Sequence, residues 1–157
     1  MKHVIVQTCS SIILYLLLGW TVVSLQTTVM TSMTALETNQ YVFELNLLPF
    51  FVLILFFIGW TIYSYNNRPN QNMSFGQWSV RMTEYSEVDE REALITAKAT
   101  KSAYVSFSIT LPLFMMSFAF YTLFSDVLPN YPVLGLIACL VIGNITYLIS
   151  WLRHFQM

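Results

Sequence analysis

The chain has 157 residues, of which 56% are hydrophobic and 10% are charged, and its net charge is −1. Soluble domains carry about 25% charged residues. The composition therefore excludes a disordered chain, a nucleic-acid-binding domain and an ordinary soluble enzyme, and no nucleic-acid partner is expected.

Four segments without Asp, Glu, Lys or Arg account for the hydrophobic excess, and they cover roughly residues 4–25, 45–65, 103–124 and 132–152. Each has about 20 residues, the length with which a helix crosses a hydrocarbon core of about 30 Å. They lack the alternation of barrel strands. The sequence predicts an all-α bundle of four transmembrane helices, forming a single integral-membrane domain over residues 1–157.

The first of these segments also has features of a signal peptide, because Lys2 precedes a long apolar run. However, Val23-Ser24-Leu25 is a poor cleavage site. We expect this segment to be retained as a membrane span.

The basic residues predict the orientation of the spans. If the N-terminus lies in the cytoplasm, the two outer loops contain Glu37, Glu44 and Asp126 and no basic residue. All 7 Lys and Arg residues then lie on the inner side. We expect a multi-pass protein of the cell's inner membrane, with both termini and the long loop 66–102 in the cytoplasm and the lipid bilayer as its first partner.

The first outer connection, about residues 26–44, is rich in threonine. Val29, Met33 and Leu36 recur at helical spacing. This pattern either extends the first helix outward or forms a short amphipathic helix on the membrane surface. A ligand-binding role for this connection remains a lesser alternative.

The central loop contains a stripe of large apolar residues, namely Phe75, Trp78, Met82 and Tyr85, with polar residues between them. The spacing of three and four predicts an amphipathic helix. Beside a membrane such a helix lies flat in the inner headgroup layer. Alternatively, the stripe docks a cytoplasmic partner or a second copy of the chain.

A charged helical stem is predicted to follow this stripe. Asp89 can cap it, and Glu92 three residues later completes a capping box. Glu90 in the first turn and Lys98 farther along suit the helix dipole. Because no helix breaker lies before Ala103, we expect the stem to continue into the third span.

Three residues of the stem, Arg91, Ile95 and Lys98, share one face. A charged stem whose lysines meet anionic lipid headgroups would explain most of this pattern without a specific partner. The face is nevertheless a candidate contact surface, and the stem's Asp89 and Glu90 belong to the same candidate region.

The run Asp89-Glu90-Arg91, then Ile95, then Lys98-Ala99, ahead of a two-helix membrane hairpin, resembles a family of small uncharacterised bacterial membrane proteins. The resemblance extends from about Asp89 to Arg153. It implies a bacterial inner-membrane location and an accessory role in gene regulation. It implies no catalytic residues, and the stem is expected to be a shared structural element.

Residues for catalysis, metal binding or a cofactor are not apparent. No His lies within a span, and His3 and His154, at the inner membrane edge, have no carboxylate nearby with which to bind a metal. Cys9 and Cys139 differ in depth by roughly 12 Å at about 1.5 Å per residue, too far for a disulfide. Both are expected to be small buried residues.

Several polar and small residues within the spans are candidates for helix contacts. Asn46 and Asn144 could hydrogen-bond between helices or bind a solute. Small residues allow helices to approach closely, which we expect at Gly19, Gly59, Gly135 and Gly143. Pro112 is expected to kink the third span, and Pro129 and Pro132 mark a tight outer turn.

The sequence favours a non-enzymatic protein that acts through protein contacts of its cytoplasmic segment, in an accessory, regulatory or immunity role. The alternative is a small dimeric transporter or pore that uses Asn46 and Asn144. An enzyme acting on lipid ranks below both, because no acid–base pair is apparent. A membrane or cytoplasmic partner is expected under the first hypothesis, and a homodimer under the second.

Overall fold

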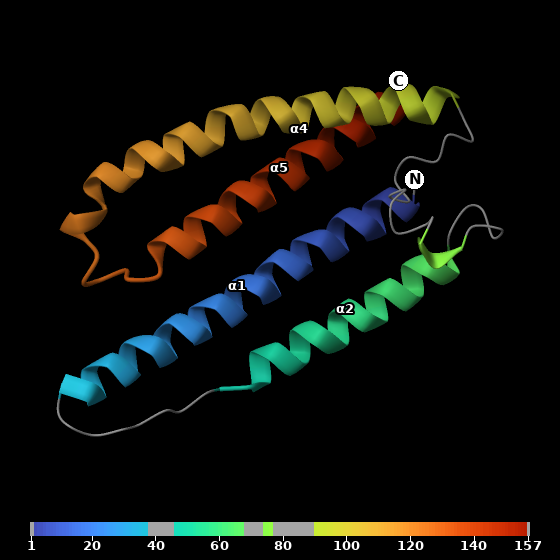
Figure 1. The fold of residues 1–157 in the computed structure, drawn as a ribbon. Coiled ribbons are helices and arrows are strands. Elements are labelled where there is room, and N and C mark those ends of the chain that lie inside the picture. The colour runs from blue at the N-terminus through green and yellow to red at the C-terminus, as the bar shows by residue number, and fades with distance from the viewer. Residues whose placement is uncertain (1, 38–45, 68–73, 77–89, 157) are drawn as a thin grey trace.

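The computed structural model describes residues 2–37, 46–67, 74–76 and 90–156, with the backbone alone for residues 34–37. Four long α-helices and one 3-10 helix account for nearly all of these residues (Figure 1). In chain order they are α1 (Lys2–Glu37), α2 (Leu48–Asn66), α4 (Glu90–Ser117), η1 (Phe118–Leu123) and α5 (Tyr131–Gln156). The described residues contain no strand, as the all-α prediction requires.

All four α-helices are long and apolar enough to cross a membrane. Helices suit this environment because they satisfy their backbone hydrogen bonds internally, away from water. Large apolar side chains are exposed along every helix. In a bilayer these side chains face lipid, so the structure agrees with the four spans predicted from the sequence.

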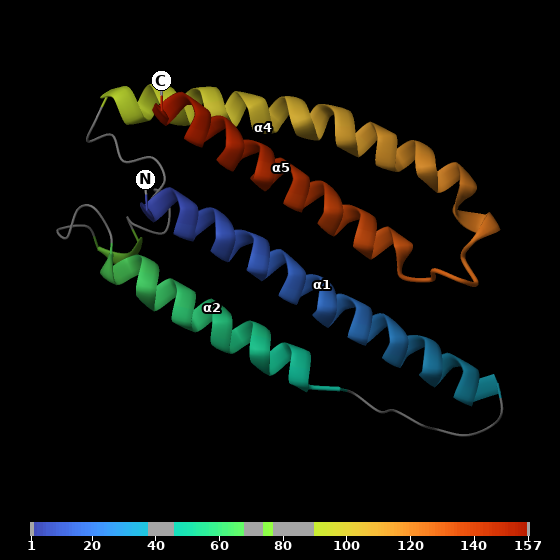
Figure 2. The same ribbon diagram turned by 180° about the vertical axis from the view of Figure 1, so that it is seen from behind.

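The helices lie side by side in the order α2, α1, α5, α4, and neighbours in this row run in opposite directions (Figures 1 and 2). Helix α5 packs most extensively against α4, and α1 lies between α5 and α2. The bundle is therefore an open row in which α2 and α4 are the outermost helices. The sequence predicts the helices but not this order.

Helix α1 decides between the two structures predicted for the first outer connection, an extension of the first helix or a short helix on the membrane surface. It continues to Glu37, and its 36 residues correspond to roughly 54 Å at 1.5 Å per residue. The hydroxyl groups of Thr28 and Thr31 donate hydrogen bonds to carbonyl groups one turn earlier, which satisfies these polar side chains within the helix. The threonine-rich segment is thus an extension of the first helix as far as residue 37.

Helix α4 joins the charged stem to the third span without a break, as predicted. Pro112 lies inside this helix, and the α-helical geometry gives way to the 3-10 helix after Ser117. The following turn at residues 124–130 contains Pro129, as predicted. Two donors meet the Pro129 carbonyl oxygen, the Tyr121 hydroxyl at 2.9 Å and the Gln26 side-chain amide at 3.3 Å, so this turn is held by residues from two helices.

Two glycines of α5 admit aromatic rings from α4. A methyl group added at Gly135 would overlap the ring of Phe114, and one added at Gly143 would overlap the ring of Phe107. The close approach expected at these two positions is confirmed. Since lipid tails solvate apolar groups as well as the protein does, such shape complementarity is a main source of helix association in membranes.

The other two glycines differ from each other. A methyl group at Gly19 would overlap the side chain of Ile137, so α1 and α5 are in close contact there. Among the described residues, nothing lies within 4 Å of an atom added at Gly59. The prediction of close approach at Gly59 is wrong, because no residue in the described part of the chain packs against this face of the outermost helix α2.

We predict that Gly143→Ala destabilises the helix row by about 1–3 kcal/mol, because the Phe107 ring must move to admit the methyl group. Thermal unfolding in detergent measures this change. Gly59→Ala is the matched control and should leave the unfolding temperature unchanged or slightly raised. Equal effects at both positions would contradict the observed α4–α5 packing.

Candidate functional site

One end of the helix row gathers most of the charged residues that the structure describes, and we call it the charged end. Both chain termini lie there (Figure 1). Lys2 begins α1, Glu90 begins α4, and Arg153 and His154 lie in the last turn of α5. The opposite end carries Asp126. The charged end therefore combines the start of the stem with the end of the last span.

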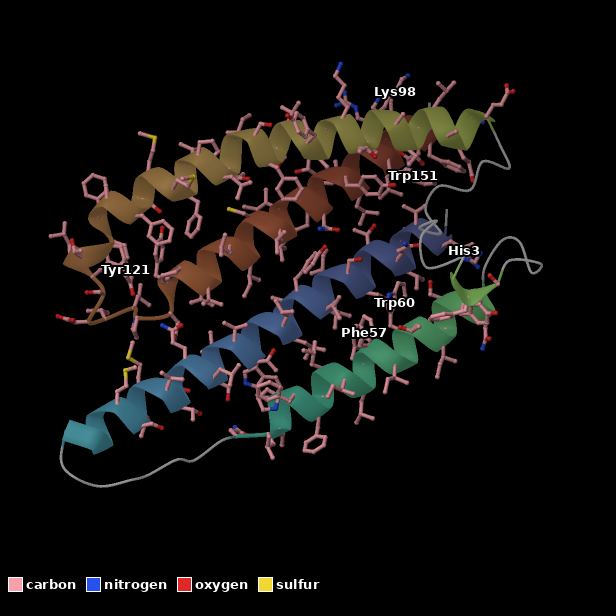
Figure 3. The ribbon with its side chains drawn as sticks, in the orientation of Figure 1. His3, Phe57, Trp60, Lys98, Tyr121 and Trp151 are labelled. Carbon is pink, nitrogen blue, oxygen red and sulfur yellow. The ribbon has the colours of Figure 1, made fainter. Side chains whose placement is uncertain are left out.

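A buried cluster docks the stem onto the last helix. It consists of Ile95 and Ala99 from α4 with Tyr147 and Trp151 from α5, and Val4 of α1 packs against it. Ala99 is 0% exposed and Trp151 is 1% exposed, because the small side chain of Ala99 leaves room for the indole. Figure 3 shows Trp151 at the α4–α5 contact.

Arg91 adds a second contact between the same two helices. Its Nη2 donates a hydrogen bond of 3.4 Å to the carbonyl oxygen of Phe155, and its guanidinium carbon lies 5.9 Å from the centre of the Phe155 ring. The Phe155 ring in turn stacks on Trp151, with centroids 4.9 Å apart. Arg91 thus ties the first turn of α4 to the last turn of α5 through a cation–π contact and a hydrogen bond.

A line of hydroxyl groups continues this contact into the membrane span. The Ser102 and Ser150 hydroxyls are 3.0 Å apart, and those of Thr146 and Ser106 are 3.3 Å apart, with Ser106 as the donor because Thr146 donates to the Ile142 carbonyl oxygen. The sequence indicates that hydroxyl groups of the spans could hydrogen-bond between helices, but it does not single out these pairs. The four-residue spacing of Ser102 with Ser106 on one span, and of Thr146 with Ser150 on the other, is the pattern that would have indicated them.

Two pockets that share His154 flank this contact at the charged end, and together we call them the seam groove. Near the end of the helices it is lined by Arg91, Leu94, Ile95, Lys98 and His154. Farther along, its walls are Ser102, Thr146, Ile149, Ser150, Arg153 and His154. The described lining contains basic, hydroxyl and apolar side chains and no carboxylate, so its electrostatic character is positive.

The structure brings together one part of the predicted contact region. Arg91, Ile95 and Lys98 line the same groove, which confirms that they share a face. Glu90 is exposed at the start of α4. Phe75 is 56% exposed and its ring lies 5.7 Å from that of Tyr65, near the end of α2. The remaining predicted contact residues, Trp78, Met82, Tyr85 and Asp89, lie outside the described residues.

The two amides expected to act within the membrane do not lie together. Asn46 precedes α2, and its side-chain oxygen accepts a hydrogen bond of 3.1 Å from the backbone N–H of Leu48. Asn144 donates to the carbonyl oxygen of Leu140 within its own helix at 2.9 Å, rather than across to a neighbouring helix. Helix α1 lies between α2 and α5. Among the described residues, the hydrogen bonds of both amides stay within their own segments, and neither bond joins two helices.

The two cysteines are free thiols, as their predicted depths require. Cys139 is buried as expected, whereas Cys9 is exposed, so the prediction of a buried Cys9 is wrong. The exposed face of α1 at this position faces lipid, where a small thiol is as acceptable as in a core. Within the described ranges, no group of three or more His, Cys, Asp or Glu residues is arranged to hold a metal ion.

Comparison with known proteins places the sequence of this chain in a family. The sequence model of the family described as "Predicted membrane protein (DUF2178)" matches residues 2–153. The chain is also 31% identical over 121 residues to a protein of Bacillus subtilis (strain 168) described as the uncharacterised lipoprotein YgaO. That match covers 75% of this chain and 72% of the relative. No solved structure matches the chain.

We predict that Ala99→Leu separates the stem from α5, because the fully buried methyl group of Ala99 lies in the buried cluster with Trp151. Overpacking of this kind costs about 1–3 kcal/mol. Limited proteolysis of the purified protein should cut the stem faster in this variant. Ala97→Leu, on the exposed side of the same helix, is the control and should leave the cleavage rate unchanged. Equal protection of both variants would contradict the docking.

Proposed function

The chain belongs to the DUF2178 family of predicted membrane proteins, and we propose that it is a non-enzymatic, multi-pass protein of the bacterial inner membrane that acts through protein contacts. Both termini and the loop 66–102 would lie in the cytoplasm. The contact region would be the cytoplasmic segment from Phe75 to Lys101. This region holds most of the charged side chains of the chain.

The observation that carries this proposal is the rigid docking of the stem. Arg91, Ile95 and Ala99 are occupied in contacts with α5. They act as positioning residues, and Glu90 and Lys98 remain on the exposed surface. A partner would therefore meet a preformed helical surface, which lowers the conformational entropy lost on binding. We propose that this stem, Asp89 to Ala99, is an element shared within the family.

The distribution of charge supports the proposed orientation. The described lysines and arginines, namely Lys2, Arg91, Lys98, Lys101 and Arg153, belong to the charged end or to the stem that leads from it. Positive residues beside membrane spans are retained on the cytoplasmic side. The end that carries Asp126 would then face outward.

We predict that a cysteine placed at Arg153 in a Cys9→Ser, Cys139→Ala background is not labelled by a membrane-impermeant maleimide added to intact cells. The same reagent should label it after the inner membrane is permeabilised. A cysteine at Asp126 is the control and should be labelled before permeabilisation. Labelling of position 153 in intact cells would overturn the proposed topology.

We also predict that a photo-crosslinking amino acid at Phe75 or at Glu90 gives an adduct with one protein in native membranes. The same amino acid at Leu113, which is exposed on the membrane-spanning part of α4, is the control and should crosslink to lipid. A second test combines the adduct at Glu90 with Ala99→Leu, which should abolish it. Adducts with lipid alone at all three positions would contradict a protein partner.

A further inference from the structure

We propose that the seam groove binds the phosphate group of an anionic phospholipid, with Lys98 and Arg153 as its ligands and Ile149 in contact with its acyl chains. This site shares Lys98 with the contact surface proposed above, but it requires no protein partner. It lies where the charged stem meets the apolar span, at the end of the α4–α5 contact. The charge, the hydrogen bonding and the apolar walls of the groove all favour such a ligand.

The charge of the groove is unusual for this chain. The protein as a whole has a net charge of −1, yet the groove presents Arg91, Lys98 and Arg153 and no carboxylate among its described lining residues. Arg91 is engaged with Phe155. Neither Lys98 nor Arg153 is paired with a carboxylate in the described ranges. Two cations held beside one groove attract a bound anion.

Hydrogen bonding shows which side chains would hold the phosphate. Ser102 donates to the carbonyl oxygen of Lys98 at 3.1 Å, so the Ser150 hydroxyl is the donor in the pair that it forms with Ser102. These hydroxyls have no hydrogen left for an anion. The donors available to a phosphate are therefore the ammonium of Lys98 and the guanidinium of Arg153, which suits phosphate oxygens in a forked geometry.

His154 is oriented by a backbone contact. Its Nδ1 lies 2.8 Å from the carbonyl oxygen of Ser150. Since a carbonyl oxygen accepts and does not donate, Nδ1 carries the hydrogen in this contact. His154 lines both parts of the groove, so it lies between the Lys98 side and the Arg153 side.

The long lysine side chain is suited to the polar end of the site. Figure 3 shows Lys98 projecting outward from α4, while the residue also lines the groove. A lysine at a membrane edge keeps its methylene chain on apolar surface and its ammonium among the headgroups. The Lys98 ammonium would thus meet a lipid phosphate at headgroup depth rather than deeper in the membrane.

The apolar walls favour a lipid over a free phosphate. Ile149, on the membrane side of Arg153, is 60% exposed and lines one pocket of the seam groove, and Leu94, at the outer end of the other pocket, is 65% exposed. Free phosphate would leave these side chains without contacts. A phospholipid presents phosphate and acyl chain together, and basic grooves between membrane helices bind such headgroups.

The test is native mass spectrometry of the full chain in detergent, titrated with phosphatidylglycerol or with phosphatidylcholine. We expect preferential retention of phosphatidylglycerol by the unmodified protein. Lys98→Gln with Arg153→Gln should weaken that retention roughly 30-fold, since each basic residue near an anionic headgroup contributes about one factor of five. Lys2→Gln with Lys101→Gln removes the same charge outside the groove and should retain the preference.

A third variant and a competing anion extend the test. Leu94→Glu adds a carboxylate at an exposed position of the groove, and it should weaken phosphatidylglycerol retention even if the double variant unfolds. Inorganic phosphate at millimolar concentration should not displace the lipid. Equal retention of both lipids by the unmodified protein, equal loss in the two double variants, or displacement by inorganic phosphate would each overturn the proposal. The photo-crosslinking results at Phe75 do not bear on any of these outcomes.

Discussion

The contact between α4 and α5 is the interaction on which the rest of the structure depends. In lipid no water drives apolar helices together, so association needs shape complementarity and polar contacts. Along this contact Gly135 and Gly143 admit aromatic rings, and Ala99 makes room for Trp151. The hydroxyl pairs of α4 and α5 add directional contacts between these regions. The last two spans and the stem are consequently one packed unit.

The same contact relates the fold to the candidate site. The seam groove exists because α4 and α5 remain side by side up to their charged ends, and Arg91 completes that contact at Phe155. By contrast, α2 contributes one buried residue, Pro49, and contacts the row mainly through α1. Its remaining surface is available to lipid. The half of the chain formed by α4 and α5 therefore carries most of the structural specificity.

The sequence predicts the membrane helices well, because uncharged runs of about 20 residues have few other stable structures. It also predicts the continuity of the stem into α4, since no glycine or proline interrupts the helix before Pro112. Gly59 and Cys9 were predicted wrongly for one shared reason. Which face of a membrane helix meets a neighbour depends on the order of the helices, and lipid-facing and buried positions have similar compositions.

The candidate site was predictable in part. The motif that contains Arg91, Ile95 and Lys98 places these residues on one face, and that face was correctly identified. The contributions of Arg153, His154 and Ser150 were not, because they come from a helix some 50 residues farther along the chain. Periodicity within one helix says nothing about the side chains that a neighbouring helix contributes.

Helix α1 has a length that its neighbour does not share. Its 36 residues extend about 54 Å, whereas the 19 residues of α2 extend about 28 Å, close to the thickness of a hydrocarbon core. Two adjacent helices with such different lengths cannot both match one bilayer when upright, so α1 must lean or project beyond the headgroups. Membrane thickness would thereby set how many turns of α1 are exposed to water. A thicker bilayer would bury turns of α1 that a thinner bilayer leaves in water.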